Sequence, residues 1–250
     1  MYQFFVGPEA IRDKTVIITG DDVNHIKNVL RMKPGEEIAV RCGEERKEYR
    51  CGIDIITEEE VRCSLYFVKE EGGELPSSIY LFQGLPKADK MEMIIQKAVE
   101  LGVSEIIPMA TKRSVVKLDE KKAAAKVSRW QAISEAAAKQ SKRAFIPRIH
   151  PVMTFSQALE YAASKQIRMI PYEMAEGMKE TRAFIERIQP GEEIAVFIGP
   201  EGGFEEKEIE QAKSCAVQPI TLGKRILRTE TAGLTVLAWL MYHLEGKDIL

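Results

Sequence analysis

Two short loops in the C-terminal half of the chain hold the residues whose types and spacing could do chemistry. The first, Gly199-Pro200-Glu201-Gly202-Gly203, separates an apolar strand-like segment from a helix-like segment. Its glycines would let the backbone approach a ligand closely, with amide groups pointing outward. The second loop, residues 222–231, interleaves three cations with two apolar residues, a pattern that helix capping by Thr229 does not require. Both loops are therefore candidates for ligand binding or catalysis.

The acidic residues at the first loop argue against a phosphate ligand. The chain contains neither a GxxxxGKS/T nor a GxGxxG motif, and Glu201, Glu205 and Glu206 would repel a triphosphate. They tolerate a ligand that is cationic or carries hydroxyl groups. S-adenosylmethionine fits, because it has a sulfonium and a ribose diol and no phosphate. The ordinary alternative is a glycine turn followed by acids that complement the dipole of the next helix.

Other residue clusters give weaker signals. Tyr172 and Glu173, an aromatic residue and an acid, end a third strand-like segment. The four cysteines form no CxxC pair and have no histidine at ligand spacing, so we expect no metal site. The three histidines are scattered, which favours structural roles.

Strands and helices must alternate from residue 79 onward to position these loops. Apolar segments typical of strands alternate with amphipathic segments typical of helices, which predicts a mostly parallel sheet covered on both faces. Ligands bind such sheets just beyond the carboxyl ends of the strands, where all three loops lie. The predicted strands are 79–85, 104–110, 167–173, 192–199 and 218–223, and the predicted helices are 91–102, 119–142, 155–165, 178–188, 204–216 and 230–245.

The first 70 residues have a different pattern, which predicts a small β-barrel with one helix. The predicted strands are 16–20, 36–42, 49–57 and 60–69, and the predicted helix is 21–32. Residues 70–78, with paired glycines and a proline, are the natural linker. We therefore expect two domains, residues 1–72 and residues 73–250.

Composition and charge are those of a globular protein with one basic segment. The 250 residues carry a net charge of −2, and they show neither a signal peptide nor an apolar stretch of membrane-spanning length, so we expect a cytoplasmic protein with no membrane partner. Between Lys112 and Arg148, eleven Lys and Arg stand against three acidic residues, a net charge of +8. Such a block can bind a polyanion or can be a solvated helix face.

The two C-terminal loops, read in series, resemble a known family. FIGPEGGF followed by LGKRILRTETA resembles the SPOUT superfamily, and more narrowly the ribosomal RNA small subunit methyltransferase E family, which methylates N3 of a uridine in 16S RNA. The segments HIKNVLRMKPGEEIAV, GLPKADKMEMIIQKAVELGVSEIIP, RSVVK and RWQAISEAAAKQSKRAFIPRI extend the resemblance over nearly the whole chain. Gly233 departs from it, since Pro or Ala is expected there.

The resemblance implies an architecture and a cofactor site. The C-terminal domain would be an α/β fold with a trefoil knot, and the N-terminal domain a PUA-like barrel that binds RNA. The protein would be a homodimer with its active site at the subunit interface and S-adenosylmethionine held in the knot. The implied cofactor contacts are Tyr172, Glu173, Ile198, Gly199, Gly203, Leu222, Gly223, Ile226 and Leu227.

Methylation of uridine N3 requires loss of an imide proton and stabilisation of the resulting anion. Arg228 is the expected electrostatic stabiliser, and Glu201 and Glu230 are the candidates for the base. The partner would be 16S ribosomal RNA or the small ribosomal subunit, held by phosphate contacts. The candidates for those contacts are Arg31, Lys33, Lys87, Lys90, Arg113, Lys117, Lys142 and Arg143.

Three alternatives stay open from the sequence. A knotted methyltransferase could act on a ribose 2′-hydroxyl or a tRNA base. A non-catalytic RNA-binding or ribosome assembly factor could keep the fold, although the intact loops count against it. An enzyme that binds nucleotide phosphates comes third, because the phosphate-loop lysine motif is missing.

Overall fold

The computed structural model describes residues 1–42, 47–69, 73–175 and 177–246, which form two compact units. The first unit comprises residues 1–74 together with 138–146, and the second comprises residues 75–137 and 147–250. The start of the predicted linker, residues 70–72, lies outside the described residues. The segment 138–146 joins the first unit although it lies far from it in sequence, which no local pattern indicates.

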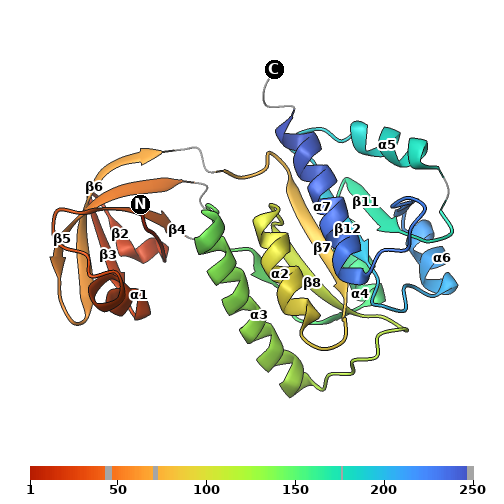
Figure 1. The fold of residues 1–250 in the computed structure, drawn as a ribbon, viewed down its shortest axis with the longest axis horizontal. Coiled ribbons are helices and arrows are strands. Elements are labelled where there is room, and N and C mark those ends of the chain that lie inside the picture. Colours follow the sequence, from red (N-terminus) through yellow and green to blue (C-terminus); the bar gives the residue numbers. More distant parts are fainter. Residues whose placement is uncertain (43–46, 70–72, 176, 247–250) are drawn as a thin grey trace. The chain divides into compact units, whose positions relative to one another are not determined.

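The first unit is built on one six-stranded sheet of order β1-β4-β5-β6-β3-β2 (Figure 1). β1 pairs with β4 in parallel, and every other pair is antiparallel. The four predicted strands are confirmed, whereas β1 and β2 were not predicted. The strands are β1 Gln3–Val6, β2 Ile11–Arg12, β3 Thr15–Thr19, β4 Glu37–Cys42, β5 Glu48–Ile56 and β6 Glu60–Lys69.

The predicted helix 21–32 is wrong in part. Only α1, Asp21–Asn24, is α-helical, and His25–Val29 continues as a π-helical turn, η2. Val23 and Ile26 are both buried in the small core of this unit, with β-branched side chains from β3, β5 and β6. The core contacts of this short segment therefore decide its geometry, and its helical periodicity does not.

The second unit holds a parallel sheet of order β10-β8-β7-β12-β11-β13, with β9 also paired to β8 (Figure 1). Every pair in it is parallel, as predicted. The short edge strands β9 and β10 were not predicted. The strands are β7 Ser78–Gly84, β8 Glu105–Ala110, β9 Arg148–Ile149, β10 Met153–Thr154, β11 Ile167–Pro171, β12 Glu193–Ile198 and β13 Gln218–Ile220.

Helices cover both faces of this sheet, as the continuous apolar strands require. On one face, Phe82 and Phe197 stack and form a core with residues of α4 and α6. On the other face α2 and α7 lie side by side (Figure 1). The predicted helices are confirmed as α2 Lys90–Glu100, α3 Glu120–Ser141, α4 Phe155–Ala162, α5 Met178–Glu186, α6 Glu206–Ser214 and α7 Thr229–Glu245.

None of the described helices has the length and apolar character that crossing a bilayer would need.

Candidate active site

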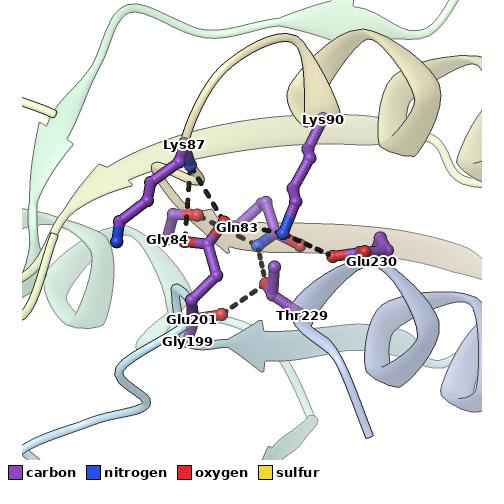
Figure 2. A network of polar contacts seen from close by, with 8 residues as sticks. All are labelled: Gln83, Gly84, Lys87, Lys90, Gly199, Glu201, Thr229 and Glu230. Carbon is purple, nitrogen blue, oxygen red and sulfur yellow. Dashed lines mark hydrogen bonds and ion pairs between the residues drawn. The ribbon is translucent and has the colours of Figure 1, made fainter. Parts of the chain in front are cut away.

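The two loops singled out in the sequence meet at the carboxyl-terminal edge of the parallel sheet. β7 ends at Gly84, β12 ends at Ile198, and α7 begins at Thr229 after the second loop. Figure 2 shows the side chains that link these three ends and the loop that precedes α2. The edge therefore holds the features expected of a ligand site in a parallel α/β sheet.

The first loop depends on close backbone approaches that only glycine permits. A Cβ atom at Gly199 would lie 3.1 Å from the backbone of Gly203, and one at Gly84 would lie 2.6 Å from Cδ of Pro200. Gly203 has φ +66°, and its amide donates to the Pro200 carbonyl at 2.9 Å. The conformation at Gly203 is one that L-residues avoid, so the turn needs glycine there.

A buried chain of hydrogen bonds joins the strand ends to the start of α7. The Gln83 carboxamide donates to the Thr229 hydroxyl at 2.9 Å and to the Gly84 carbonyl at 3.0 Å. The Thr229 hydroxyl in turn donates to the Gly199 carbonyl at 2.6 Å. Thr229 does not cap α7, because Arg228 occupies the N-cap position and the Thr229 hydroxyl bonds to another segment. No local sequence signal identified Gln83.

Glu201 lies beside Lys87, in the loop before α2, and Lys90, the first residue of α2. Its carboxylate accepts from the Lys87 backbone amide at 3.1 Å and from the Lys90 ammonium at 2.9 Å (Figure 2). Partial burial would raise the pKa of Glu201, but these hydrogen bonds outweigh it and hold that pKa below its ordinary value. Lys90 also forms an ion pair with Glu230 at 3.4 Å, so one ammonium bridges both candidate bases.

Glu230 differs from Glu201 in its partners. Its Oε2 atom is buried and accepts no hydrogen bond among the described residues, although the Lys90 ammonium is near. Arg228, two positions earlier, is exposed, and no hydrogen bond or ion pair of its side chain is found within the described part of the chain. The Arg228 side chain is therefore available to a ligand, whereas the buried oxygen of Glu230 has only the Lys90 ammonium near it among the described residues.

The second loop presents a largely open surface. Gly223 has φ +101°, and a Cβ atom there would meet nothing within 4 Å. Leu222 and Leu227 are half-buried, and Ile226 is 81% exposed. The loop therefore leaves its apolar side chains accessible to solvent.

The third predicted loop, at the end of β11, is placed at the same edge by a bond to β13. The Tyr172 amide donates to the Ile220 carbonyl at 3.0 Å, while the Tyr172 side chain packs against the core that faces α4 and α6. Glu173 is exposed, and Ile198 is 2% exposed. Ile198 can therefore offer a ligand chiefly its backbone.

The predicted RNA contacts divide by exposure. Arg143 is not available at the surface, because its side chain is 4% exposed and pairs with Glu74 inside the first unit. Arg113 is exposed but donates to the Gly202 carbonyl at 2.9 Å, which ties it to the first loop. Lys90 is occupied by the two carboxylates described above. The remaining candidates are exposed: Arg31, Lys33, Lys87, Lys117 and Lys142.

Comparison with known proteins matches both parts of the chain. Residues 73–241 match the RNA methyltransferase domain family, and residues 18–65 match the RNA methyltransferase PUA domain family. The ribosomal RNA small subunit methyltransferase E of Bacillus subtilis (strain 168) is 39% identical over 92% of this chain and 91% of its own length.

Two solved structures share the fold over nearly the whole chain. The ribosomal RNA small subunit methyltransferase E of Neisseria gonorrhoeae, bound to S-adenosyl methionine, is 33% identical, has a TM-score of 0.82 and covers 95% of both chains. A Legionella pneumophila methyltransferase in complex with the cofactor SAM is 31% identical, has the same TM-score and covers 95% of this chain and 96% of its own.

These matches, together with the parallel sheet and the separate β unit, confirm the predicted fold class, an α/β-knot domain with a PUA-like domain before it. Both family models describe RNA methyltransferases, and the identity to the Bacillus subtilis protein extends through both units. The chain is therefore an RNA methyltransferase and belongs to the ribosomal RNA small subunit methyltransferase E family.

Proposed function

We propose that this protein transfers a methyl group from S-adenosylmethionine to N3 of a uridine in 16S ribosomal RNA. Besides family membership, one hydrogen bond in the structure supports this proposal. The hydroxyl of Thr229, where the second loop enters α7, bonds to the carbonyl of Gly199, the first residue of the first loop. The acidic, glycine-rich loop and the basic loop therefore bound a single site.

The residues at this edge fit S-adenosylmethionine. A Cβ atom at either Gly203 or Gly223 would point into open space, so both glycines leave room for a ligand against the backbone. Half-buried Leu222 and Leu227 offer apolar surface to an adenine ring. When bound, S-adenosylmethionine supplies an electrophilic methyl group. The proposed contacts are Tyr172, Glu173, Ile198, Gly199, Gly203, Leu222, Gly223, Ile226 and Leu227.

For the chemistry, we assign the proton acceptor to Glu230 in preference to Glu201. The lowered pKa of Glu201 makes it a weak base, and its hydrogen bonds from Lys87 and Lys90 occupy its oxygens. Oε2 of Glu230 accepts no hydrogen bond among the described residues and has only an ion pair with Lys90 at 3.4 Å, so we propose it as the acceptor of the imide proton of a uracil. The exposed Arg228 would stabilise the anion that forms, whose charge spreads over O2 and O4.

RNA binding is assigned to residues 1–72 as a PUA-like domain, with phosphate contacts from both units. The exposed cations Arg31, Lys33, Lys87, Lys117 and Lys142 are free to neutralise phosphates. We propose a cytoplasmic protein, because that is where its proposed ribosomal substrate is found.

A homodimer is proposed from the surface of α7. This helix is apolar on nearly all sides, yet Leu234, Ala238 and Trp239 are only half-buried and Tyr242 is 82% exposed. A helix that is apolar all round belongs in an interior. A second copy of the chain would bury this face next to the exposed Ile226, and sedimentation velocity should give twice the 28.2 kDa chain mass. A monomer at micromolar concentration would contradict the dimer.

The deciding experiment has two parts. Calorimetric titration with S-adenosylmethionine, with ATP as control, should show binding of the first alone. Incubation with 16S RNA, naked or in the small subunit, should then yield 3-methyluridine on nucleoside analysis. A 2′-O-methylated nucleoside or a modified tRNA would show that the methylated position is not uridine N3 of 16S RNA. Absence of S-adenosylmethionine binding would instead favour a non-catalytic assembly factor.

A further inference from the structure

We infer that Gln83 and Thr229 are positioning residues that hold the two candidate cofactor loops in place relative to each other. The inference rests on the proposed function, because it assigns these loops to S-adenosylmethionine. Neither residue was a predicted site residue, and neither is assigned a ligand contact. They would affect cofactor binding by holding Gly199 and the start of α7 in position.

In this chain of hydrogen bonds, each group acts as donor or acceptor in a way that the geometry determines. Gln83 donates with the same nitrogen to Thr229 and to Gly84, at 2.9 and 3.0 Å, so its amide group is anchored to the end of β7. The Thr229 hydroxyl receives that bond and gives its own proton to the Gly199 carbonyl at 2.6 Å. The bonds thus run in one direction, from β7 through α7 to the end of β12 (Figure 2).

Burial makes these bonds rigid. Gln83 is fully buried and Thr229 is 5% exposed, so water does not compete for either group. Thr229 directly follows the loop 222–228, and Gly199 opens the loop 199–203. A single hydroxyl therefore sets the spacing between the two walls of the proposed cofactor site.

The free oxygen of Gln83 indicates that stability alone does not explain this residue. Its Oε1 atom is buried and accepts no hydrogen bond among the described residues. A buried unpaired carbonyl destabilises a fold, and an apolar side chain of the same shape would avoid that penalty. Gln83 lies on the face of the sheet covered by α7, where Leu81 and Ile79 are buried apolar residues. We therefore attribute the amide at this position to the bonds that it donates.

The test compares Thr229→Val with Thr229→Ser, since valine keeps the shape and serine keeps the hydroxyl. S-adenosylmethionine is titrated into each full-length variant by calorimetry, at a temperature where melting curves show it folded. Thr229→Val should weaken binding about tenfold, the equivalent of one buried hydrogen bond. Thr229→Ser should bind within about twofold of the wild type. In steady-state assays KM for S-adenosylmethionine should rise and KM for RNA should not.

Two further variants separate positioning from general stability. Thr235→Val is the matched control, because among the described residues the Thr235 hydroxyl bonds only to the Thr231 carbonyl inside α7. It should leave cofactor affinity unchanged. Gln83→Met removes the unpaired oxygen and also the bonds donated to Gly84 and Thr229, so its effects on the melting temperature oppose each other. It should lower affinity for S-adenosylmethionine at a temperature where the variant is fully folded, which a merely structural role would not produce.

The outcomes distinguish this inference from the proposed function. If the wild type does not bind S-adenosylmethionine, the proposed function fails. If the wild type binds and both Thr229→Val and Gln83→Met bind equally well, the proposed function stands and the positioning role is refuted. A loss of affinity in Thr235→Val as large as in Thr229→Val would also refute it.

Discussion

Lys90 has a different environment from the one its sequence neighbours suggest. Its position three residues after Lys87 led us to expect a phosphate contact, but Lys90 begins α2 and its ammonium lies between Glu201 and Glu230. The hydrogen bond with Glu201 raises the pKa of Lys90, so its ammonium stays protonated at neutral pH. Arg228, in contrast, has no side-chain partner among the described residues and is exposed. Of Lys90 and Arg228, Arg228 is therefore the one available for chemistry.

Replacing Arg228 by Ala should lower kcat roughly 100-fold, the usual effect of removing one group that stabilises a developing anion. The melting temperature should not change, because the side chain is exposed and makes no contact that α7 needs. Arg225→Ala, in the same loop and equally exposed, is the control. Near-normal turnover in Arg228→Ala would show that Arg228 does not stabilise the uracil anion.

Replacing Lys117 by Ala should reduce the salt dependence of RNA binding. Each lost phosphate contact lowers the slope of log K against log salt by about 0.7 to 0.9. Lys207→Ala, on α6 outside the basic segment, should leave the slope unchanged. The measurement is RNA affinity by filter binding at several salt concentrations, and equal slopes for both variants would exclude Lys117 as a contact.

Helix α7 begins at the site, and its packing shows whether a residue larger than Gly233 would fit there. The Cα of this residue faces Ile198, Leu81 and the Gln83 carboxamide across the sheet. A Cβ atom there would lie 3.6 Å from Ile198 and 3.7 Å from Gln83, ordinary van der Waals distances. The helix therefore has room for the larger residue that the family resemblance leads us to expect.

Replacing Gly233 by Ala should stabilise the protein by about 0.5 to 1 kcal/mol, because alanine loses less backbone entropy in a helix interior. For a chain of this size that is a rise in Tm of about 2 °C by calorimetry. Gly84→Ala should instead destabilise the protein, because its Cβ would lie 2.6 and 2.7 Å from two atoms of Pro200. It should lower both Tm and cofactor affinity, and a Gly233→Ala variant less stable than the wild type would show that α7 cannot accept the methyl group.

At the scale of the whole molecule, the candidate site and a stabilising polar network lie at opposite edges of the sheet in the second unit. The carboxyl-terminal edge carries the loops, whereas the opposite edge carries a polar network around Glu105. His150 and Tyr161 both bond to the Glu105 carboxylate, at 2.6 and 2.8 Å. Burial would raise the pKa of Glu105, but these two hydrogen bonds outweigh it and lower that pKa below 4.5.

This network predicts how the stability of the folded protein depends on pH. Because the folded-state pKa of Glu105 is depressed, its contribution is fully present above pH 4.5 and is lost as pH falls through the lowered value. The wild type should therefore exceed Glu105→Gln in free energy of unfolding at neutral pH, and the gap should close in acid. Chemical denaturation of both proteins at several pH values measures it, and a gap independent of pH would contradict the network's role.

The sequence by itself determined the features that repeat locally. The alternation of strands and helices, the parallel sheet and the three loops at its carboxyl edge all follow from periodicity and from turn residues. These predictions were confirmed because most residues of the central strands are buried and apolar, with Gln83 of β7 the main exception at the site. The fold class and the regions that contain the site were therefore readable before any contact was known.

Only the tertiary structure decided which side chains meet. Gln83 and Thr229 lie 146 positions apart, as their hydrogen bond records, and no pattern in either segment indicates the other. The same holds for the burial of Arg143 against Glu74 and for Lys90 between two acids. Local sequence reports propensity and periodicity, whereas the partner of a polar group depends on how distant segments pack, and burial makes that pairing obligatory.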